Sequence, residues 1–359
     1  TTNDVNLTSP TDDVVFSWTA SVPSGISGIT TTSGTDYIPE ATLINTTNQP
    51  LTVAYTAIAT GDVGFDCEGL PTFHFITVNP LAMINPVNDQ IICDGDNILV
   101  EFSSDLSGGN LTYSWTNDNP NIGLSDTGTG NIDVIATNTT NAPISSTIVV
   151  TPSFENGGNT NVGDPITFEI TVNPTGQVNS IGNQIVSNGF ETSFVEFSTI
   201  NINGTTTYDW LNDLTSIGLA ASGTGNIPAF SSVNSGTSPI TAIVNVTPTF
   251  ENGGVNCEGP AIPFEITVNP TAQVNPTNDF IVSNGDNINI PFTTINSGGT
   301  TTYNWSNSDS TVGLTATGFG DIDFTVVNNG TAPVTTTVVV IGDVPVFTAV
   351  NPISPDHIF

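Results

Sequence analysis

The sequence predicts an all-β protein, a linear tandem array of about four small antiparallel β-sandwich domains. The first observation is a tryptophan that recurs at positions 18, 115, 210 and 305, each time one residue after a Ser, Asp or Asn that follows an aromatic residue. The second is Val-Asn-Pro, which ends a strand-like run at 78–80, 172–174, 268–270 and 350–352. A period near 95 residues is the size of one small sandwich.

These markers divide the 359 residues into repeat 1 (1–80), repeat 2 (81–174), repeat 3 (175–270) and repeat 4 (271–359). Only 17 residues precede Trp18, so repeat 1 lacks its first strand. Repeat 4 is shortened, because 47 residues separate Trp305 from its closing Pro352, against 59 to 62 in the other repeats. An incomplete sandwich leaves an unpaired sheet edge. The missing strand comes from sequence outside this window or from a neighbouring chain.

Repeat 3 shows the expected strands in order. Short runs of β-branched and aromatic residues alternate with polar ones and are bounded by Gly, Pro, Asn and Ser, which indicates strands and turns. No helical periodicity of useful length is present. We expect seven short strands per repeat, with those of repeat 3 including 184–186, 193–198, 205–210, 227–233, 239–247 and 264–268, and a long loop at 211–226.

The tryptophans are candidate core residues. Trp210 falls on the third predicted strand, which packs at the centre of an immunoglobulin-like sandwich, and Trp18, Trp115 and Trp305 occupy the same place in their repeats. The Gly-x-Gly-Asn/Asp runs at 128–131, 223–226 and 318–321 are expected to be turns, because they lack the spacing and the helix of a phosphate-binding loop.

The composition excludes several kinds of partner. Asp and Glu number 33, Lys and Arg number zero, and the formal net charge is −33. Phosphate neutralisation needs basic side chains, so nucleic acid is excluded and anionic lipid surfaces are disfavoured. No apolar stretch approaches 18 residues, so no membrane insertion is expected. The chain starts at Thr1 without an initiator Met, and we expect it to be a window onto something longer.

Several segments resemble a known repeat family. They are 218–227 (Gly-Leu-Ala-Ala-Ser-Gly-Thr-Gly-Asn-Ile), 303–305 (Tyr-Asn-Trp), 238–242 (Ser-Pro-Ile-Thr-Ala) and 264–270 (Phe-Glu-Ile-Thr-Val-Asn-Pro). They are similar to the PKD-like, Ig-like repeats of giant cell-surface adhesins of Bacteroidota, including gliding-motility adhesins. The resemblance implies type IX secretion, an extracellular cell-surface filament, attachment to surfaces or polysaccharides, and neighbouring repeats and the gliding or secretion machinery as partners.

Three cysteines occur, at 67, 93 and 257. Cys67 and Cys257 occupy equivalent places, and no complete pair exists within one repeat. A bond between Cys67 and Cys93 would join repeats 1 and 2 and contribute about 3 kcal/mol in the chain-entropy model. The alternative is a set of lone thiols, and both possibilities stay open.

Structural calcium is the one metal that the sequence suggests; no other cofactor is expected. Asp94 and Asp96 in Cys-Asp-Gly-Asp-Asn, and Asp286 in Ser-Asn-Gly-Asp-Asn, place oxygen ligands on tight turns near repeat boundaries. Hard cations prefer such oxygens, but no twelve-residue calcium loop is present. Asp-Gly-Asp is also a common solvated turn.

Catalysis is not expected. His74 and His357 are the only imidazoles, and His74 is expected to be partly buried on a strand. No Gly-x-Ser-x-Gly motif, lysine nucleophile or Arg is present. We expect a stalk for surface attachment and gliding motility. The alternatives are repeats that themselves bind polysaccharide, and a fibre subunit that assembles by strand donation. The apparent lack of stacked exposed aromatic residues favours the stalk.

Overall fold

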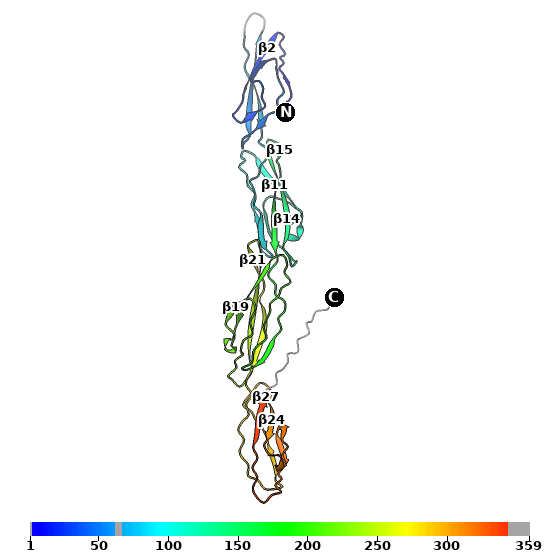
Figure 1. Ribbon diagram of the computed structural model, residues 1–359. Helices are drawn as coiled ribbons and strands as arrows, with labels where there is room; N and C mark the ends of the chain where they lie inside the picture. Colours follow the sequence, from blue (N-terminus) through cyan, green and yellow to red (C-terminus); the bar gives the residue numbers. More distant parts are fainter. Residues whose placement is uncertain (1, 62–66, 344–359) are drawn as a thin grey trace. The chain divides into compact units, whose positions relative to one another are not determined.

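The computed structural model describes residues 2–61 and 67–343, and these residues form strands joined by turns (Figure 1). The chain divides into two compact units, Thr1–Pro174 and Thr175–Phe359. Four separate hydrophobic clusters are present in the described residues, and each draws its side chains from one predicted repeat. The protein is therefore an all-β tandem array in which no core is shared between repeats.

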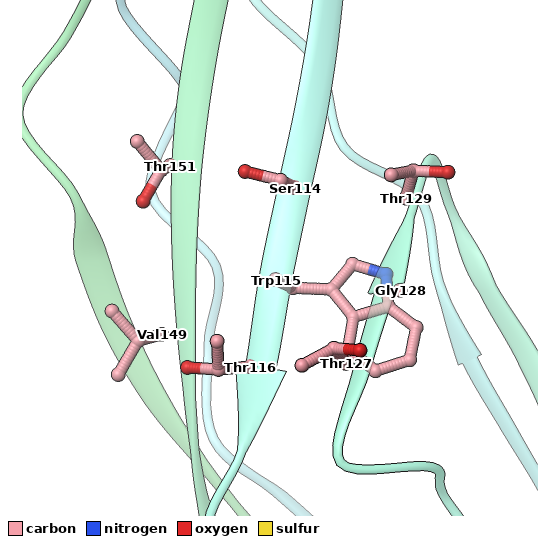
Figure 2. Close-up of a pocket in the computed structure, with 8 residues that line it drawn as sticks. All are labelled: Ser114, Trp115, Thr116, Thr127, Gly128, Thr129, Val149 and Thr151. Carbon is pink, nitrogen blue, oxygen red and sulfur yellow. The ribbon is translucent and has the colours of Figure 1, made fainter.

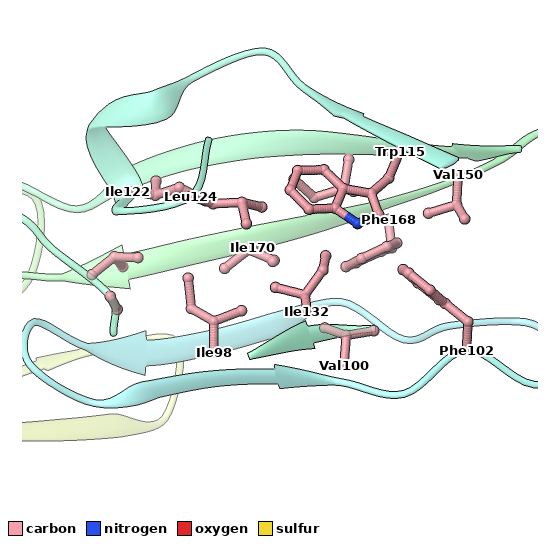
Figure 3. Packing of buried hydrophobic residues seen from close by; sticks show 13 residues of the cluster. Ile98, Val100, Phe102, Trp115, Ile122, Leu124, Ile132, Val150, Phe168 and Ile170 are labelled. Carbon is pink, nitrogen blue, oxygen red and sulfur yellow. The ribbon is translucent and has the colours of Figure 1, made fainter. Parts of the chain in front are cut away.

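Repeat 2 contains a large sheet with the strand order β12-β11-β14-β16-β9, with β15 pairing to β14. A second small sheet, β10–β13, lies across the core, and Figure 3 shows side chains of the two layers meeting between them. The strands are β9 (Gln90–Cys93), β10 (Asn97–Val100), β11 (Asn110–Asn117), β12 (Thr127–Thr129), β13 (Ile132–Ile135), β14 (Ile144–Asn156), β15 (Asn159–Val162) and β16 (Ile166–Asn173).

Repeat 3 has the same order, β19-β18-β20-β22-β17, with β21 pairing to β20. Its strands are β17 (Gln184–Ser187), β18 (Thr205–Asn212), β19 (Ser222–Thr224), β20 (Ile240–Asn252), β21 (Val255–Glu258) and β22 (Ile262–Asn269). The first strand pairs with the last in parallel in both repeats, β9 with β16 and β17 with β22, so the prediction of a wholly antiparallel sandwich is wrong at this edge.

The second layer of repeat 3 also differs from the prediction. Segments 193–198 and 227–233 are not strands, and this layer contains the isolated bridges Glu191↔Ser231 and Val195↔Ile227 in place of a continuous ladder. Pro228 interrupts the second segment and has no N–H for a ladder. Beyond it, the Phe230 amide donates to the Thr192 hydroxyl at 3.1 Å, so a side chain takes the place of a backbone acceptor.

Repeats 1 and 4 have smaller sheets. Repeat 1 has the order β4-β2-β7-β8 and two short pairs, β1–β5 and β3–β6; repeat 4 has β25-β24-β27 and the pair β23–β26. Their strands are β1 (Val5–Asn6), β2 (Val14–Ser21), β3 (Ile26–Ser27), β4 (Ser33–Thr35), β5 (Tyr37–Ile38), β6 (Ile44–Asn45), β7 (Leu51–Gly61), β8 (Thr72–Val78), β23 (Asn287–Ile290), β24 (Thr302–Asn307), β25 (Thr317–Phe319), β26 (Ile322–Thr325) and β27 (Val338–Asp343).

The loop after each tryptophan strand of repeats 2 to 4 contains a single 3₁₀ turn. These turns are η1 (Pro120–Ile122), η2 (Thr215–Ile217) and η3 (Ser310–Val312), and each buries its last residue. Each ends at a glycine with φ between 90° and 99°, a conformation that favours glycine: Gly123, Gly218 and Gly313.

All four tryptophans are buried, with 3 to 8% of their surface exposed. Each indole lies over a glycine on the neighbouring strand, as Trp115 lies over Gly128. A Cβ atom on that glycine would stand 2.0 to 2.9 Å from the ring in every repeat, so the position has no room for a side chain. The four glycines are Gly34, Gly128, Gly223 and Gly318.

The Gly-x-Gly-Asn/Asp runs are thus only partly turns. In repeat 2, Gly128 lies on β12, and Gly130 makes the turn with a φ of 72° and accepts the Trp115 indole N–H at 3.1 Å. The side chain of Asn131 then accepts the Phe102 amide at 3.0 Å and ties the two layers together. Among the described residues, the buried indole N–H groups of Trp210 and Trp305 have no hydrogen-bond partner.

Candidate functional site

The predicted calcium ligands serve as acceptors for backbone amides. Asp94 Oδ1 accepts the Asn138 amide at 2.7 Å, and Asp96 Oδ2 accepts the Cys93 amide at 3.2 Å. Asp286 Oδ2 accepts the Ser283 amide at 2.7 Å in the matching turn of repeat 4. The role of Asp94 needs no charge, because Asn188 and Asn284 perform it in repeats 3 and 4.

Across residues 2–61 and 67–343, no group of three or more His, Cys, Asp or Glu side chains is placed to hold a metal ion. Structural calcium at Asp94, Asp96 and Asp286 therefore stays a prediction from the sequence. The local geometry supports the alternative, a solvated turn whose carboxylates bond to backbone amides.

The Cys67–Cys93 bond, one of the two possibilities that the sequence left open, is wrong, and so is the other, a set of lone thiols. Cys67 has an exposed free thiol, whereas Cys93 is disulfide-bonded, as is Cys257. The topology explains the error, because Cys93 lies opposite Asn173 at the end of β16, where repeat 2 closes. Repeat 2 meets repeat 1 through other residues, which are described below.

His74 is exposed rather than partly buried. Its position on β8 corresponds to that of Phe168 on β16 and Phe264 on β22, which are buried. The core of repeat 1 is smaller and does not cover His74. Nothing in the described residues indicates catalysis. No helical segment among them has the length and apolar character needed to span a membrane.

A buried asparagine that donates to the last strand recurs in repeats 1, 2 and 3, as Asn45, Asn138 and Asn234. Asn138 donates its two amide hydrogens to the carbonyls of Ala142 and Val172, both at 2.8 Å, and accepts the Thr140 amide at 2.9 Å. Asn234 does the same with Ser238 and Val268. These asparagines fasten the last strand of the sandwich to the preceding loop, a role that the sequence analysis missed.

Two carboxylates near the tryptophan strands are held by hydrogen bonds. The Ser146 hydroxyl and the Thr147 amide donate to Asp118 Oδ1 at 2.7 and 2.8 Å and lower the pKa of Asp118 below its usual value. In repeat 4, the hydroxyl and then the amide of Thr311 lower the pKa of Asp309 in the same way. Both carboxylates face solvent and are charged at neutral pH.

Repeats 1 and 2, which belong to the same unit, meet through backbone groups. The Ser107 amide donates to the Asn48 carbonyl at 2.9 Å. Gly108, with a φ of 80°, lies against Pro50, where an added Cβ would stand 2.9 Å from the ring. Next to this contact, Asn156 Nδ2 donates to Asn79 Oδ1 at 2.8 Å.

Repeats 3 and 4, in the second unit, meet in the same way. The Ser297 amide donates to the Thr237 carbonyl at 2.8 Å, and Gly298, with a φ of 75°, lies against Pro239. The hydroxyls of Ser238 and Ser297 are 2.6 Å apart. We call this arrangement, a Ser amide on the carbonyl of the preceding repeat beside a Gly–Pro contact, the junction latch.

The outer face of the repeat 2 sheet is lined by hydroxyl groups. Figure 2 shows a shallow hollow of about 410 Å³ over β11, β12 and β14, in which Ser and Thr side chains surround the buried edge of Trp115. Its lining residues are Ser114, Trp115, Thr116, Thr127, Gly128, Thr129, Val149 and Thr151. None of them is an exposed aromatic residue, so the hollow offers hydrogen bonds but no stacking surface for a sugar ring.

An exposed pair of aromatic rings lies elsewhere, on β8 of repeat 1. Phe73 and Phe75 stack with their ring centroids 6.3 Å apart and their planes within 7° of each other. They are 58% and 63% exposed. The expectation that stacked exposed aromatic residues are lacking is therefore wrong, because residues two apart on a strand lie on the same face.

Comparison with known proteins supports a PKD-like sequence at the N-terminal end. The PKD-like domain family matches residues 1–82. No curated protein matches the chain.

Solved structures that match are also tandem arrays. Cadherin domains 1–4 of protocadherin gamma B7 are 10% identical, with 91% of this chain and 92% of that one covered and a TM-score of 0.31. The first three domains of mouse protocadherin-24 are 12% identical, with 71% of this chain and 90% of that one covered and a TM-score of 0.26. Immunoglobulin domains 1–5 of Sidekick-1 are 13% identical, with 95% of this chain and 74% of that one covered and a TM-score of 0.24. Residues 1–82 are thus similar to PKD-like domains, within a chain that is all-β in every repeat.

Proposed function

We propose that this chain is a stalk segment of a secreted cell-surface filament or adhesin, which holds an attachment site away from the cell. PKD-like domains are typical of extracellular proteins, and residues 1–82 match that family. A role in gliding motility and export by type IX secretion rest on the resemblance of the repeats. A stalk needs repeats that fold separately and junctions that resist bending.

The junction latch carries this proposal. It occurs with the same geometry between repeats 1 and 2 and between repeats 3 and 4. A backbone hydrogen bond and a proline packed on a glycine restrict the hinge without relying on long side chains. The neighbouring Asn79–Asn156 pair adds a second point of contact beside the first, so repeats 1 and 2 are held together at two places.

The charge of the chain supports the same role. With 33 acidic residues and no basic ones, the repeats repel one another at low ionic strength. Repulsion between successive repeats favours an extended stalk and opposes collapse onto anionic surfaces. The effect weakens as salt screens charges farther apart than about 10 Å at 0.1 M.

The test is the width of a distance distribution across the first junction. One nitroxide label is placed on the natural free thiol of Cys67 and a second on Thr127→Cys in repeat 2, and the distribution is measured by pulsed electron spin resonance. We expect a narrow distribution in the full-length chain. Gly108→Val, which places a side chain against Pro50, should broaden it.

Gly95→Val is the matched control, since Gly95 in the same repeat has a similar positive φ of 89° but faces open space. It carries the same backbone strain without touching the junction, so the distribution should stay narrow. A parent chain with a distribution as broad as that of Gly108→Val would contradict a stiff stalk.

The exposed phenylalanine pair favours a second candidate function, contact with a polysaccharide. Parallel exposed rings offer a flat apolar surface on which a sugar face can pack. Glycan-array binding by the full chain, lost in Phe73→Ser/Phe75→Ser and kept in Phe319→Ser, would establish this function. Phe319 is 85% exposed in repeat 4 and has no stacked neighbour in the described residues. Absence of binding by the parent chain would dismiss it.

A further inference from the structure

The sheet of repeat 4 ends early in the described residues. In repeat 3 the long strand β20 pairs with β22, which in turn pairs in parallel with β17. In repeat 4 the corresponding strand, β27, pairs only with β24 among the described residues. It begins at Val338, whereas the residue that corresponds to the start of β20 is Val334. The free edge of β27 thus faces the place where two further strands lie in repeat 3.

A groove with apolar walls occupies that place. Phe280, Ile281 and Val282 correspond to β17 and are 52%, 103% and 42% exposed, whereas Val186 in repeat 3 is 8% exposed. With Phe324 and Val334 they line a cavity of about 400 Å³. An open strand edge beside exposed apolar side chains is a site for strand addition.

The groove also contains the counterparts of the residues that anchor the last strand in repeats 2 and 3. Asn138 and Asn234 each donate to the carbonyl of the last-strand valine, Val172 or Val268, at 2.8 Å. Their counterpart, Asn328, lines the groove, is only half-buried, and donates to Ala332 at 3.1 Å. Its second amide hydrogen is available for the same kind of acceptor.

Two more anchors of the last strand recur in repeats 2 and 3. The amides of Asp94 and Asn188 donate to the carbonyl of the asparagine that follows the valine, at 2.8 and 2.9 Å. Asn284 is the counterpart in repeat 4.

The third anchor accepts an amide from the last strand. Asp89 Oδ1 accepts the Glu169 amide at 2.7 Å, and Asn183 Oδ1 accepts the Glu265 amide at 2.8 Å. Asp279 holds this position in repeat 4. Three polar groups of the groove are therefore placed to set the register of an added strand through its backbone carbonyls and amide.

A segment of this chain outside the described residues has the required sequence. Residues 344–352 read Val-Pro-Val-Phe-Thr-Ala-Val-Asn-Pro, beside Ile-Pro-Phe-Glu-Ile-Thr-Val-Asn-Pro at 262–270. Aligned on Val-Asn-Pro, this segment offers the carbonyls of Val350 and Asn351 to Asn328 and Asn284, and the Phe347 amide to Asp279. Val346 and Val350 fall on the side that faces the core.

The connection to β27 decides which copy supplies the segment. In repeat 3, residues 247–261 separate the paired residues Val246 and Ile262. Their counterparts, Val340 and Val344, are separated by residues 341–343 alone, and these pair with β24 at Asn304, Tyr303 and Thr302. A return within the same chain would break those three pairs, whereas a second copy can supply the strand without breaking any.

We propose that residues 344–351 of one copy complete repeat 4 of a second copy, and that two copies exchange these segments reciprocally. Each copy has one groove and one segment, so the exchange closes as a symmetric dimer. The pairing of β17 with β22 gives the expected neighbours. Val186 lies opposite Val268 in repeat 3, so Val350 of one copy should lie opposite Val282 of the other.

The experiment is a disulfide trap in the full-length chain. Cys67→Ser removes the free thiol, and Val282→Cys with Val350→Cys places two thiols on the proposed neighbours. After mild oxidation, we expect most of the protein to migrate at twice the chain mass on a non-reducing gel. The parent chain should sediment as a dimer at micromolar concentration.

Every other outcome overturns part or all of the proposal. A bond formed within one chain would show that the strand returns in cis and would refute the exchange. Two free thiols would refute the groove as the site of this segment. The control is Val282→Cys with Ile353→Cys, which lies beyond the proposed segment and should remain largely uncoupled. A monomeric parent chain at all concentrations would likewise refute the dimer.

Discussion

Repeats 3 and 4 share the tryptophan strand, the glycine beneath the indole and the 3₁₀ turn, yet their cores differ in size. The buried cluster of repeat 3 contains thirteen residues, and that of repeat 4 contains five in its described part. The shared residues keep their burial, as Ile227 and Ile322 are 0% and 1% exposed. Of the eight additional buried residues in repeat 3, Phe264, Ile266 and Val268 lie on β22, three more lie on β20, and the other two are Val186 on β17 and Val195.

This comparison shows that the sandwich has two parts with different requirements. The tryptophan, its glycine and the loop that follows form a local cluster whose members are close in sequence. The other part depends on a last strand that crosses the whole sheet and covers its edge. A repeat can therefore keep its indole packing when the last strand is supplied differently.

The largest effect is expected from the last strand of a complete repeat. Ile266→Ala removes a side chain with no exposed surface and should lower the free energy of unfolding of repeat 3 by about 2–5 kcal/mol. Hydrogen exchange of peptides from repeat 3, read by mass spectrometry, measures the loss. Ile341→Ala in repeat 4 is the control, because Ile341 is 65% exposed and should change stability by less than about 0.5 kcal/mol. Equal losses of unfolding free energy in Ile266→Ala and Ile341→Ala would contradict the expected difference between the two positions.

The next effect tests the part that both repeats share. Gly223→Ala and Gly318→Ala place a Cβ 2.2 and 2.1 Å from the indoles of Trp210 and Trp305. Overpacking of this kind costs about 1–3 kcal/mol, and we expect similar losses in both repeats. Tryptophan fluorescence should shift to longer wavelength as each ring is displaced. Gly225→Ala, at a positive φ but facing open space, should leave the emission unchanged, and unequal shifts at 223 and 318 would argue against a common cluster.

The asparagine anchors provide a smaller and more selective test. Asn234→Ala leaves the carbonyls of Ser238 and Val268 without their donor and should cost about 1–3 kcal/mol. Asn328→Ala should cost less in a monomeric chain, since only the Ala332 carbonyl loses a donor in the described residues. Hydrogen exchange of the segments that these two asparagines contact, in repeat 3 and in repeat 4, compares the variants. If Asn328→Ala is the more damaging in a monomer, the last strand of repeat 4 is already in place within the chain.

The smallest effect is a dependence on pH. Hydrogen bonds lower the pKa of Asp118 and Asp309 in the folded chain, so their contribution to stability is present above the usual value of 3.8 and is lost as pH falls through the folded pKa. Asp118→Asn and Asp309→Asn should make local opening beside these residues less sensitive to acid. Amide exchange between pH 2 and 5 measures this, and unchanged acid sensitivity would contradict the assignment.

The sequence was informative where the signal is local and repeated. The spacing of the tryptophans placed the core residues, and alternating residues located the strand at 205–210 and the one at 264–268. It was misleading at 227–233, where Pro228 removes a backbone donor and leaves only isolated bridges. The parallel pairing of β17 with β22 joins segments about 80 residues apart, and alternation says nothing about which distant strands meet.

The candidate sites were harder to predict for a related reason. Calcium binding at Asp94 stays a prediction; what the sequence alone does not show is that this position accepts a backbone amide, a role that Asn fills in repeats 3 and 4. Asn138 was overlooked, since its partners Ala142 and Val172 meet only in the folded repeat. The free Cys67 shows that equivalent positions, 67 and 257, need not share a redox state.

The most direct test of the account is hydrogen exchange of the full-length chain at a concentration where it is monomeric. A repeat with a more complete sheet should be the more stable one. We predict the slowest exchange in the central strands of repeats 2 and 3, at 146–150 and 242–246, and exchange faster by orders of magnitude at 338–342. Equal protection of all three segments would contradict it.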